Sequence, residues 1–88
     1  MIEQILQERA KTHGDFKEQA KISQILKDQM AQTDGWKEMW DPVKREALQM
    51  IQHKIARILA GNPNEIDHWR DIAGYATLVA KELENAKS

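Results

Sequence analysis

The sequence predicts an all-α fold, a four-helix bundle-like arrangement with a one-turn insert before the third long helix. Apolar residues recur at helical spacing in four segments, no segment alternates strictly as a strand would, and two prolines and four glycines punctuate the chain. The 88 residues are 41% hydrophobic and 31% charged, which is typical of a globular chain. We therefore expect a single all-α domain over residues 1–88.

The first two predicted helices meet at a sharp corner. Helical spacing covers residues 2–13, and Gly14 then supplies the residue that most easily adopts the left-handed C-terminal cap. Asp15 is a candidate N-cap for a second helix that runs to about Gln32, with Glu18 completing a capping-box-like pair. The second helix is predicted to bury an apolar stripe of Phe16, Ala20, Ile22, Ile25, Leu26 and Met30.

Start and stop signals delimit the rest of the chain. Residues 33–35 break the pattern, and residues 36–40 suffice for one helical turn. Asp41 and Pro42 are a strong start signal for the third long helix, which is predicted to end at Gly61. The turn at residues 62–64 leads to a last helix, capped by Asn64 or Asp67, whose apolar residues run from Ile66 to Leu83; residues 84–88 are expected to fray.

Composition excludes several classes of function. Thirteen basic and fourteen acidic residues leave a net charge of −1, which argues against nucleic acid and anionic membranes as partners. Basic residues on the third long helix keep DNA binding only as a minor alternative.

The chain has no cysteine, so disulfides and thiolate zinc sites are excluded. The N-terminal segment lacks a signal-peptide pattern, and the longest weakly polar run, residues 72–80, is too short to span a bilayer. We expect a cytoplasmic protein.

A lysine interrupts the apolar face of the third long helix. Lys54 lies between Ile51 and Ile58, at positions where helical spacing calls for apolar side chains. Either its alkyl stem packs while the ammonium reaches water, or Lys54 and Arg57 face a cavity that receives phosphate or carboxylates from the last helix. The sequence leaves both interpretations open.

Two aspartates form the second anomaly. Asp67 and Asp71 share one side of the last helix and border Gly74, where the missing side chain permits close approach by a ligand or another backbone. Such like charges repel unless a cation lies between them, and that cation is either Mg²⁺ or a basic side chain. Glu46, on the preceding helix, is by itself weak evidence because a first-turn glutamate usually compensates the helix dipole.

The histidines give a weaker signal. His53 lies beside an apolar face and is predicted to be a partly buried structural residue, with a ligand or base as the alternative. His68 is expected at the surface or in a cap. No histidine pair has the spacing typical of a zinc site.

The anomalous residues coincide with a resemblance. The segments Arg45–Leu48, His53–Pro63 and Asp67–Ala76, with an upstream corner at Glu8–Phe16, resemble a family of small phage and prophage proteins of uncharacterised function. That family is in turn similar to reduced MazG-like all-α nucleoside triphosphate pyrophosphohydrolases, which hydrolyse nucleoside triphosphates with Mg²⁺ held by acidic pairs on successive helices.

The MazG-like resemblance implies roles for five residues. Glu46, Asp67 and Asp71 would be metal ligands for Mg²⁺. Lys54 and Arg57 would both contact phosphate. The bound partner would be a nucleoside triphosphate. The sequence departs from the pattern at Gln49, which stands where a second carboxylate is wanted, and in the four-residue spacing of its aspartates. Catalytic residues are not assigned.

A non-catalytic role is the alternative. In it the chain is an oligomeric helical interaction module of phage origin, and Lys54 pairs with Asp67 or Asp71 in a structural network. Both functions favour a homo-oligomer, because so short a chain cannot easily cover a lysine, two aspartates and three tryptophans by itself.

Overall fold

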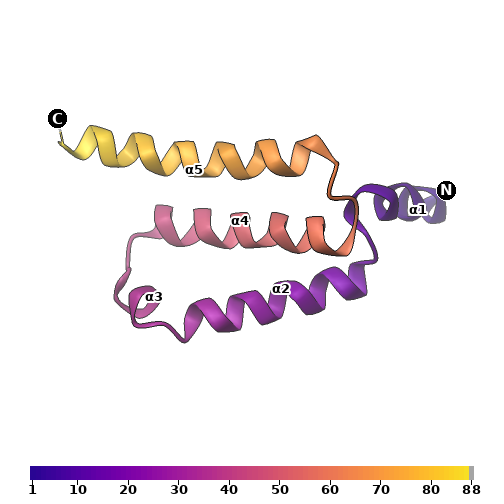
Figure 1. The fold of residues 1–88 in the computed structure, drawn as a ribbon, viewed down its shortest axis with the longest axis horizontal. Coiled ribbons are helices and arrows are strands. Elements are labelled where there is room, and N and C mark those ends of the chain that lie inside the picture. Colours follow the sequence, from indigo (N-terminus) through magenta and orange to yellow (C-terminus); the bar gives the residue numbers. More distant parts are fainter. Residues whose placement is uncertain (88) are drawn as a thin grey trace.

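The computed structural model describes residues 1–87, apart from the side chains of residues 10, 12 and 13. Helices dominate this part of the chain and it contains no strand, which confirms the all-α prediction. Figure 1 shows the helices in chain order. They are α1 (Ile2–His13), α2 (Phe16–Ala31), α3 (Asp34–Glu38), α4 (Pro42–Ala60) and α5 (Ile66–Lys87).

The predicted helix boundaries are largely confirmed because their caps are local. The Asp15 carboxylate accepts a hydrogen bond from the Lys17 backbone amide and begins α2. The Asp41 carboxylate accepts one from the Val43 amide and begins α4, with Pro42 in its first turn. The one-turn insert is α3, which Thr33 caps; it begins at Asp34, two residues before the predicted turn at residues 36–40. The last helix differs from the prediction at both ends. It begins at Ile66, so Asp67 lies inside its first turn and does not cap it, and it continues through residues 84–87, where the sequence predicted fraying. Residue 88 lies outside the described residues.

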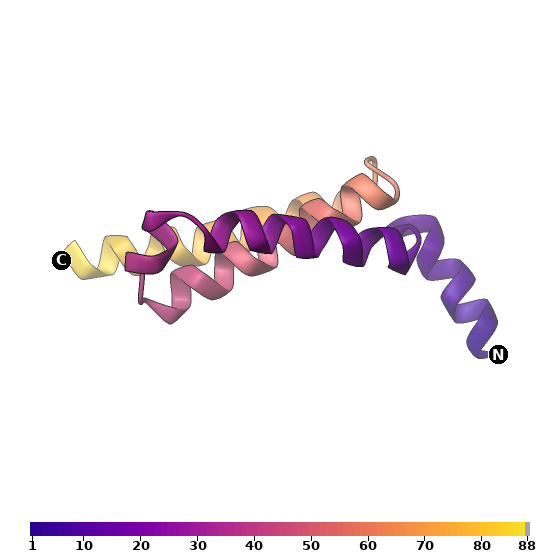
Figure 2. The same cartoon turned by 90° about the horizontal axis from the view of Figure 1, so that it is seen from below.

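The three long helices α2, α4 and α5 form one layer. Short connections make neighbours antiparallel, and α4 lies between α2 and α5 and packs against both (Figure 1). Figure 2, seen from below, shows the thin profile of this layer and α1 turned away from its end. The molecule extends 50 × 28 × 22 Å. As the middle helix of a single layer, α4 has two long sides that neither α2 nor α5 covers.

The corner between α1 and α2 is fixed against the end of α4. Gly14 has a φ of 77°, the left-handed conformation that the sequence predicted for it. A Cβ atom added there would lie 1.9 Å from the Ala60 carbonyl oxygen. The corner therefore requires glycine for its backbone conformation and for its close approach to α4.

Few apolar side chains are fully buried within the described part of the chain. Among the described side chains, the buried apolar residues are Ala47, Ala56 and Ile58, all on α4. The predicted stripe of α2 is confirmed in part: four of its six residues are half-buried, whereas Phe16 is 75% exposed and Ile25 52% exposed. The fully buried positions of α2 are polar, Gln19 and Ser23.

No helix within the described part of the chain is both long enough and apolar enough to cross a membrane.

Candidate functional site

Lys54 and Asp71 join α4 to α5 through an ion pair. The Lys54 ammonium lies 2.9 Å from the Asp71 carboxylate, and the two side chains are 10% and 48% exposed. Lys54 extends from the side of α4 that carries buried Ala47 and Ile58. Of the interpretations that the sequence left open, pairing with a carboxylate of the last helix is the one in the structure.

The electrostatics favour an ionised Asp71. The hydrogen bond from Lys54 lowers the pKa of Asp71 below its usual value, and desolvation opposes this shift. Attraction to Lys54, His68 and Arg57 lowers the pKa of Asp71 further. Asp71 is thus a half-exposed carboxylate whose charge is held by basic groups of two helices.

The carboxylates predicted to bind Mg²⁺ do not converge in one chain. Among the described residues no group of three or more histidine, aspartate and glutamate side chains lies close enough to hold a metal ion. Glu46 precedes Lys54 by eight residues, about 12 Å of helix. Asp67 and Asp71 are both exposed. A single chain therefore brings Asp71 to Lys54 but does not assemble the ligand set of Glu46, Asp67 and Asp71.

His68 is a buried residue that the sequence placed wrongly at the surface. Its exposed fraction is 1%, and its backbone amide donates to the Glu65 carbonyl at the start of α5. His68 shares a helix face with Asp71 and Ile72, three and four residues later, and that spacing was the available signal for burial.

The seam between α2 and α4 is polar. The Gln19 amide nitrogen lies 3.3 Å from Nε2 of His53, which is partly buried as predicted. The Ser23 hydroxyl donates to the Gln52 side-chain carbonyl, also at 3.3 Å, and the Gln52 amide nitrogen is buried without a hydrogen-bond partner. These long bonds and the unsatisfied amide make a weak contact between the helices.

An arginine that the sequence did not single out fixes the insert to α4. The Arg45 guanidinium donates to the carbonyls of Trp36 and Met39. It also lies 5.1 Å from the ring of Trp36 and 4.9 Å from the ring of Trp40, within the range of cation–π attraction. The third tryptophan, Trp69, also makes a contact inside the chain, because its indole nitrogen donates to the Pro63 carbonyl at 2.8 Å.

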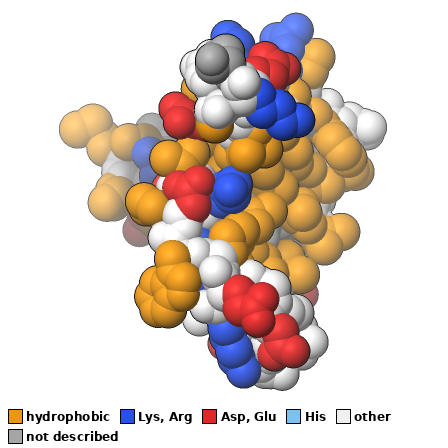
Figure 3. All heavy atoms as spheres, turned by 90° about the vertical axis from the view of Figure 1, so that its left-hand side faces the viewer, with side chains coloured by type: hydrophobic (Ala, Val, Ile, Leu, Met, Phe, Trp, Pro, Cys, Tyr) orange, Lys and Arg blue, Asp and Glu red, His pale blue; other side chains and the backbone are white. Residues whose placement is uncertain are grey.

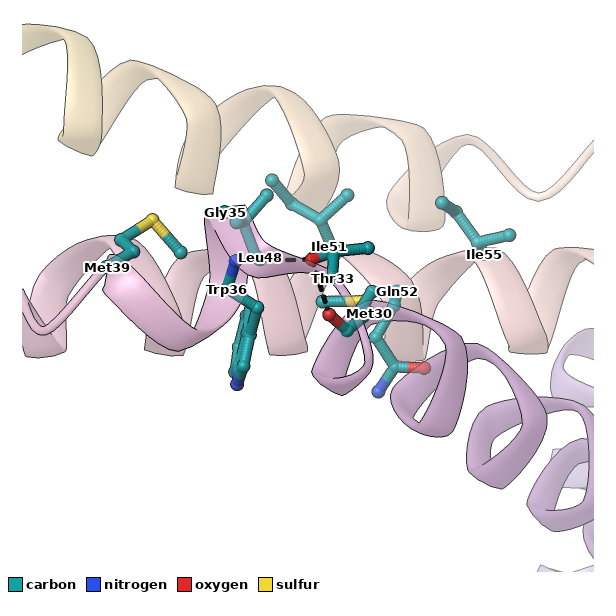
Figure 4. Close-up of a pocket in the computed structure, with 9 residues that line it drawn as sticks. All are labelled: Met30, Thr33, Gly35, Trp36, Met39, Leu48, Ile51, Gln52 and Ile55. Atoms are coloured by element: carbon teal, nitrogen blue, oxygen red, sulfur yellow. Dashed lines mark hydrogen bonds between the residues drawn. The ribbon is translucent and has the colours of Figure 1, made fainter.

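One side of the layer carries a continuous apolar surface. A hollow of about 480 Å³ lies between α2, α3 and α4 (Figure 4), and a second hollow between α4 and α5 shares three of its lining residues. Figure 3 shows hydrophobic side chains gathered along one flank in an end view. We call this surface the apolar face; its main residues are Met39, Leu48, Ile51, Ile55, Val79 and Leu83.

Gly74, which follows the two aspartates on α5, has no neighbouring side chain or helix packed against it in the described part of the chain. A Cβ atom added at Gly74 would meet no atom within 4 Å. The close approach that the sequence suggested for Gly74 is not made by another part of the described chain.

Replacing Asp71 with asparagine is expected to lower the urea midpoint of unfolding, because the buried amine of Lys54 loses its carboxylate partner. Lys54→Met is expected to change the free energy of unfolding by less than about 1.5 kcal/mol, since an apolar side chain of similar volume needs no partner.

The contribution of the ion pair to the free energy of unfolding is expected to depend on pH, because pairing lowers the pKa of Asp71 in the folded chain. This contribution is complete above the pKa of an unfolded-chain aspartate, about 4, and is lost as the pH falls through the lower pKa of the folded chain.

Urea titrations of wild type and variants at neutral pH and near pH 3 measure these effects. Asp67→Asn is the matched control and is expected to move the midpoint less, because Asp67 is exposed. An unchanged or raised midpoint for Asp71→Asn would contradict a structural ion pair and indicate carboxylates that repel one another.

The fold and the Lys54–Asp71 pair define a small all-α protein in which helices are joined in one layer by a central helix. The chain belongs to the family described as a domain of unknown function, DUF6378, whose match covers residues 2–83. Comparison with curated proteins and with solved structures finds no significant match. The family description states no activity, so the resemblance to small phage proteins and to MazG-like pyrophosphohydrolases stays a prediction.

Proposed function

We propose that this protein is a self-associating helical module in which a second copy of the chain covers the apolar face. The observation that carries the proposal is the accessible surface, 6723 Å². A folded monomer of 10.2 kDa is expected to expose about 5,300 Å². The excess is roughly 1,400 Å², more than the area of about 800 Å² that each partner buries in a standard interface.

The shape of the chain supports the same conclusion. Its radius of gyration is 15.2 Å, against about 12 Å for a compact chain of 88 residues. Stable domains pack at least two layers around a core, whereas α2, α4 and α5 make one. A second layer supplied by another copy would give α4 the cover that its own chain lacks.

The composition of the apolar face favours a second copy as the occupant. Leu48, Ile51 and Ile55 follow one another at helical spacing along α4 and form one apolar strip, and a two-fold axis would bring the same strip of two copies together. The net charge of −1 gives two copies little mutual repulsion. The dimer would be built around α4 of each chain, with α5 and the α3 insert at the rim.

Sedimentation equilibrium over a wide range of protein concentration tests this function. The expected mass is twice the 10.2 kDa of the chain or a larger multiple, and the melting temperature is expected to rise with protein concentration. A folded, helical species that keeps the mass of one chain at every concentration would overturn the proposal.

Magnesium-dependent binding of a nucleoside triphosphate, with hydrolysis between the α and β phosphates, is the second candidate. The observation in its favour is the half-exposed, ionised Asp71, one turn from Asp67 on α5 and attracted to Arg57. The described residues of one chain do not fit a metal ion, so a further carboxylate would have to come from another subunit.

Incubation with canonical and modified deoxynucleoside triphosphates and Mg²⁺, followed by detection of pyrophosphate, tests the second candidate. Turnover that is lost in Asp71→Asn and kept in Glu38→Gln, a remote and exposed carboxylate, is the expected result. No turnover together with no ligand-induced rise in melting temperature would exclude nucleotide binding.

A further inference from the structure

The apolar face is covered at one end of α4 and open at the other. The α3 insert packs beside the first turn of α4, where the Arg45 guanidinium donates to the carbonyls of Trp36 and Met39. Trp36 and Met39 line the same hollow as Leu48 (Figure 4). Leu59 follows Leu48 by eleven residues, about three helical turns, so it lies on the same side of α4, yet it is 65% exposed. Within the described chain, the far end of the face therefore lacks the cover that α3 gives to the near end.

The open end continues onto the start of α5. Ala76 and Leu83 line the hollow between α4 and α5. Trp69 precedes Ala76 by seven residues, so these three residues share one side of α5. Trp69 is 53% exposed, and its indole nitrogen is already bonded to the Pro63 carbonyl. An apolar area thus lies open where α4 ends and α5 begins.

A two-fold axis can place a second copy on the apolar face in two ways. An axis along α4 makes the two α4 helices parallel, so the covered ends meet each other and the open ends meet each other. An axis across α4 makes the two helices antiparallel. The α3 insert of each copy then comes to the open end of the other copy.

The charge at the start of α4 favours the antiparallel arrangement. Lys44 lines the apolar face beside Leu48, and its contact with Asp41 is an exposed one at 3.6 Å. In a parallel pair the two Lys44 ammoniums would face each other and repel. Lys44 precedes Ile51 by seven residues and Leu59 follows it by eight, so an antiparallel pair centred on Ile51 brings Lys44 level with the partner's Leu59. That position is the carboxyl end of the partner's α4, whose free carbonyls attract a cation.

We infer that the second copy packs antiparallel across the apolar face. The two α4 helices cross near Ile51, and the α3 insert of each copy lies toward the partner's Leu59 and the partner's Trp69. The inference rests on the proposed self-association and adds the orientation of the two chains. In this orientation two exposed apolar side chains of each copy are covered, and the two Lys44 charges are kept apart.

Single cysteines test the orientation, because the chain contains no cysteine of its own. A disulfide needs Cα atoms within about 7 Å of each other. Under mild oxidation with oxidised glutathione, Ile51→Cys is expected to link most of the chains into dimers. Leu59→Cys is expected to link no more than Leu78→Cys, an exposed control outside the apolar face, because the two copies of residue 59 would lie about 24 Å apart.

A double variant supplies a positive test at the ends of the face. Lys44→Cys combined with Leu59→Cys is expected to give dimers linked through disulfides between residues 44 and 59, which peptide mass analysis identifies. Within one chain these positions are about 22 Å apart along α4, so such a disulfide joins two chains.

The outcomes separate this inference from the proposed function. Linking by Leu59→Cys alone as readily as by Ile51→Cys would show parallel helices and overturn the antiparallel pairing, while self-association stands. A dimeric mass with no linking above the Leu78→Cys background in any variant would overturn it as well. A wild-type chain that sediments as a monomer at every concentration would remove the proposed function itself. Sedimentation of each variant under reducing conditions shows that it still associates.

Discussion

Gly14→Ala is expected to destabilise the protein by about 3 kcal/mol or to release α1 from the layer. Alanine in the left-handed conformation costs about 1–2 kcal/mol. The added Cβ atom would also lie 1.9 Å from the Ala60 carbonyl oxygen, which is backbone and cannot rotate away. The corner must therefore open, and opening it removes one wall of a pocket that Arg57 also lines.

The urea midpoint and limited proteolysis at the corner measure this effect. Gly74→Ala is the control, because a Cβ atom there meets nothing within 4 Å and the position is inside α5. By helix propensity Gly74→Ala should stabilise the protein by about 1 kcal/mol. Equal midpoints and equal protease resistance for the two variants would contradict the tight corner.

Leu48→Glu is expected to convert the assembly to single chains, with a rise of roughly 100-fold in the dissociation constant. Leu48 is 40% exposed and lines both hollows of the apolar face. A glutamate there remains solvated in the free chain but would lose its water between two copies. The helical content of the single chain should be preserved, which circular dichroism checks.

Sedimentation of Leu48→Glu beside Leu78→Glu identifies the surface that pairs. Leu78 is 59% exposed and lies on α5 against Glu46 and Tyr75, outside the apolar face. The control should keep the wild-type mass. If Leu78→Glu dissociates the assembly and Leu48→Glu does not, the apolar face is not the interface, although self-association itself stands.

Helix boundaries were predictable from the sequence because they depend on neighbouring residues. Asp15, Asp41 and Gly14 act within one turn of the chain, through a side chain that accepts a backbone amide or through a left-handed φ. Such local signals are independent of how the helices pack. Gly61 also ends α4 as predicted, with its amide donating to the Arg57 carbonyl, although its φ is negative.

The buried side of each helix was less predictable. Periodicity places Phe16 and Ile25 in one stripe with four half-buried residues of α2, yet these two are exposed, while Gln19 and Ser23 are buried. In a chain with more apolar surface than its own core accommodates, apolar spacing does not distinguish an internal face from one that another chain covers. The same limitation applies to His68, whose burial depends on packing across helices.

Of the candidate site, only the contact between Lys54 and Asp71 was predictable from the sequence. An unexpected lysine on one helix and an aspartate on the next suggested the contact that Lys54 and Asp71 make. The position of Glu46 relative to Asp67 and Asp71 depends on the register between α4 and α5. That register depends on how the buried residues of the two helices pack. Spacing within a helix carries no such information, so the three-carboxylate set was an inference from resemblance.

The accessible surface of the folded chain has a calorimetric consequence. Heat capacity of unfolding arises mainly from hydration of newly exposed apolar surface. An unfolded chain of 10.2 kDa exposes about 14,800 Å², against 6723 Å² for the folded chain. A standard interface buries about 800 Å² on each chain. Melting of the free chain should therefore carry the larger part of the heat capacity change, and dissociation should add a smaller part that is separable at low protein concentration.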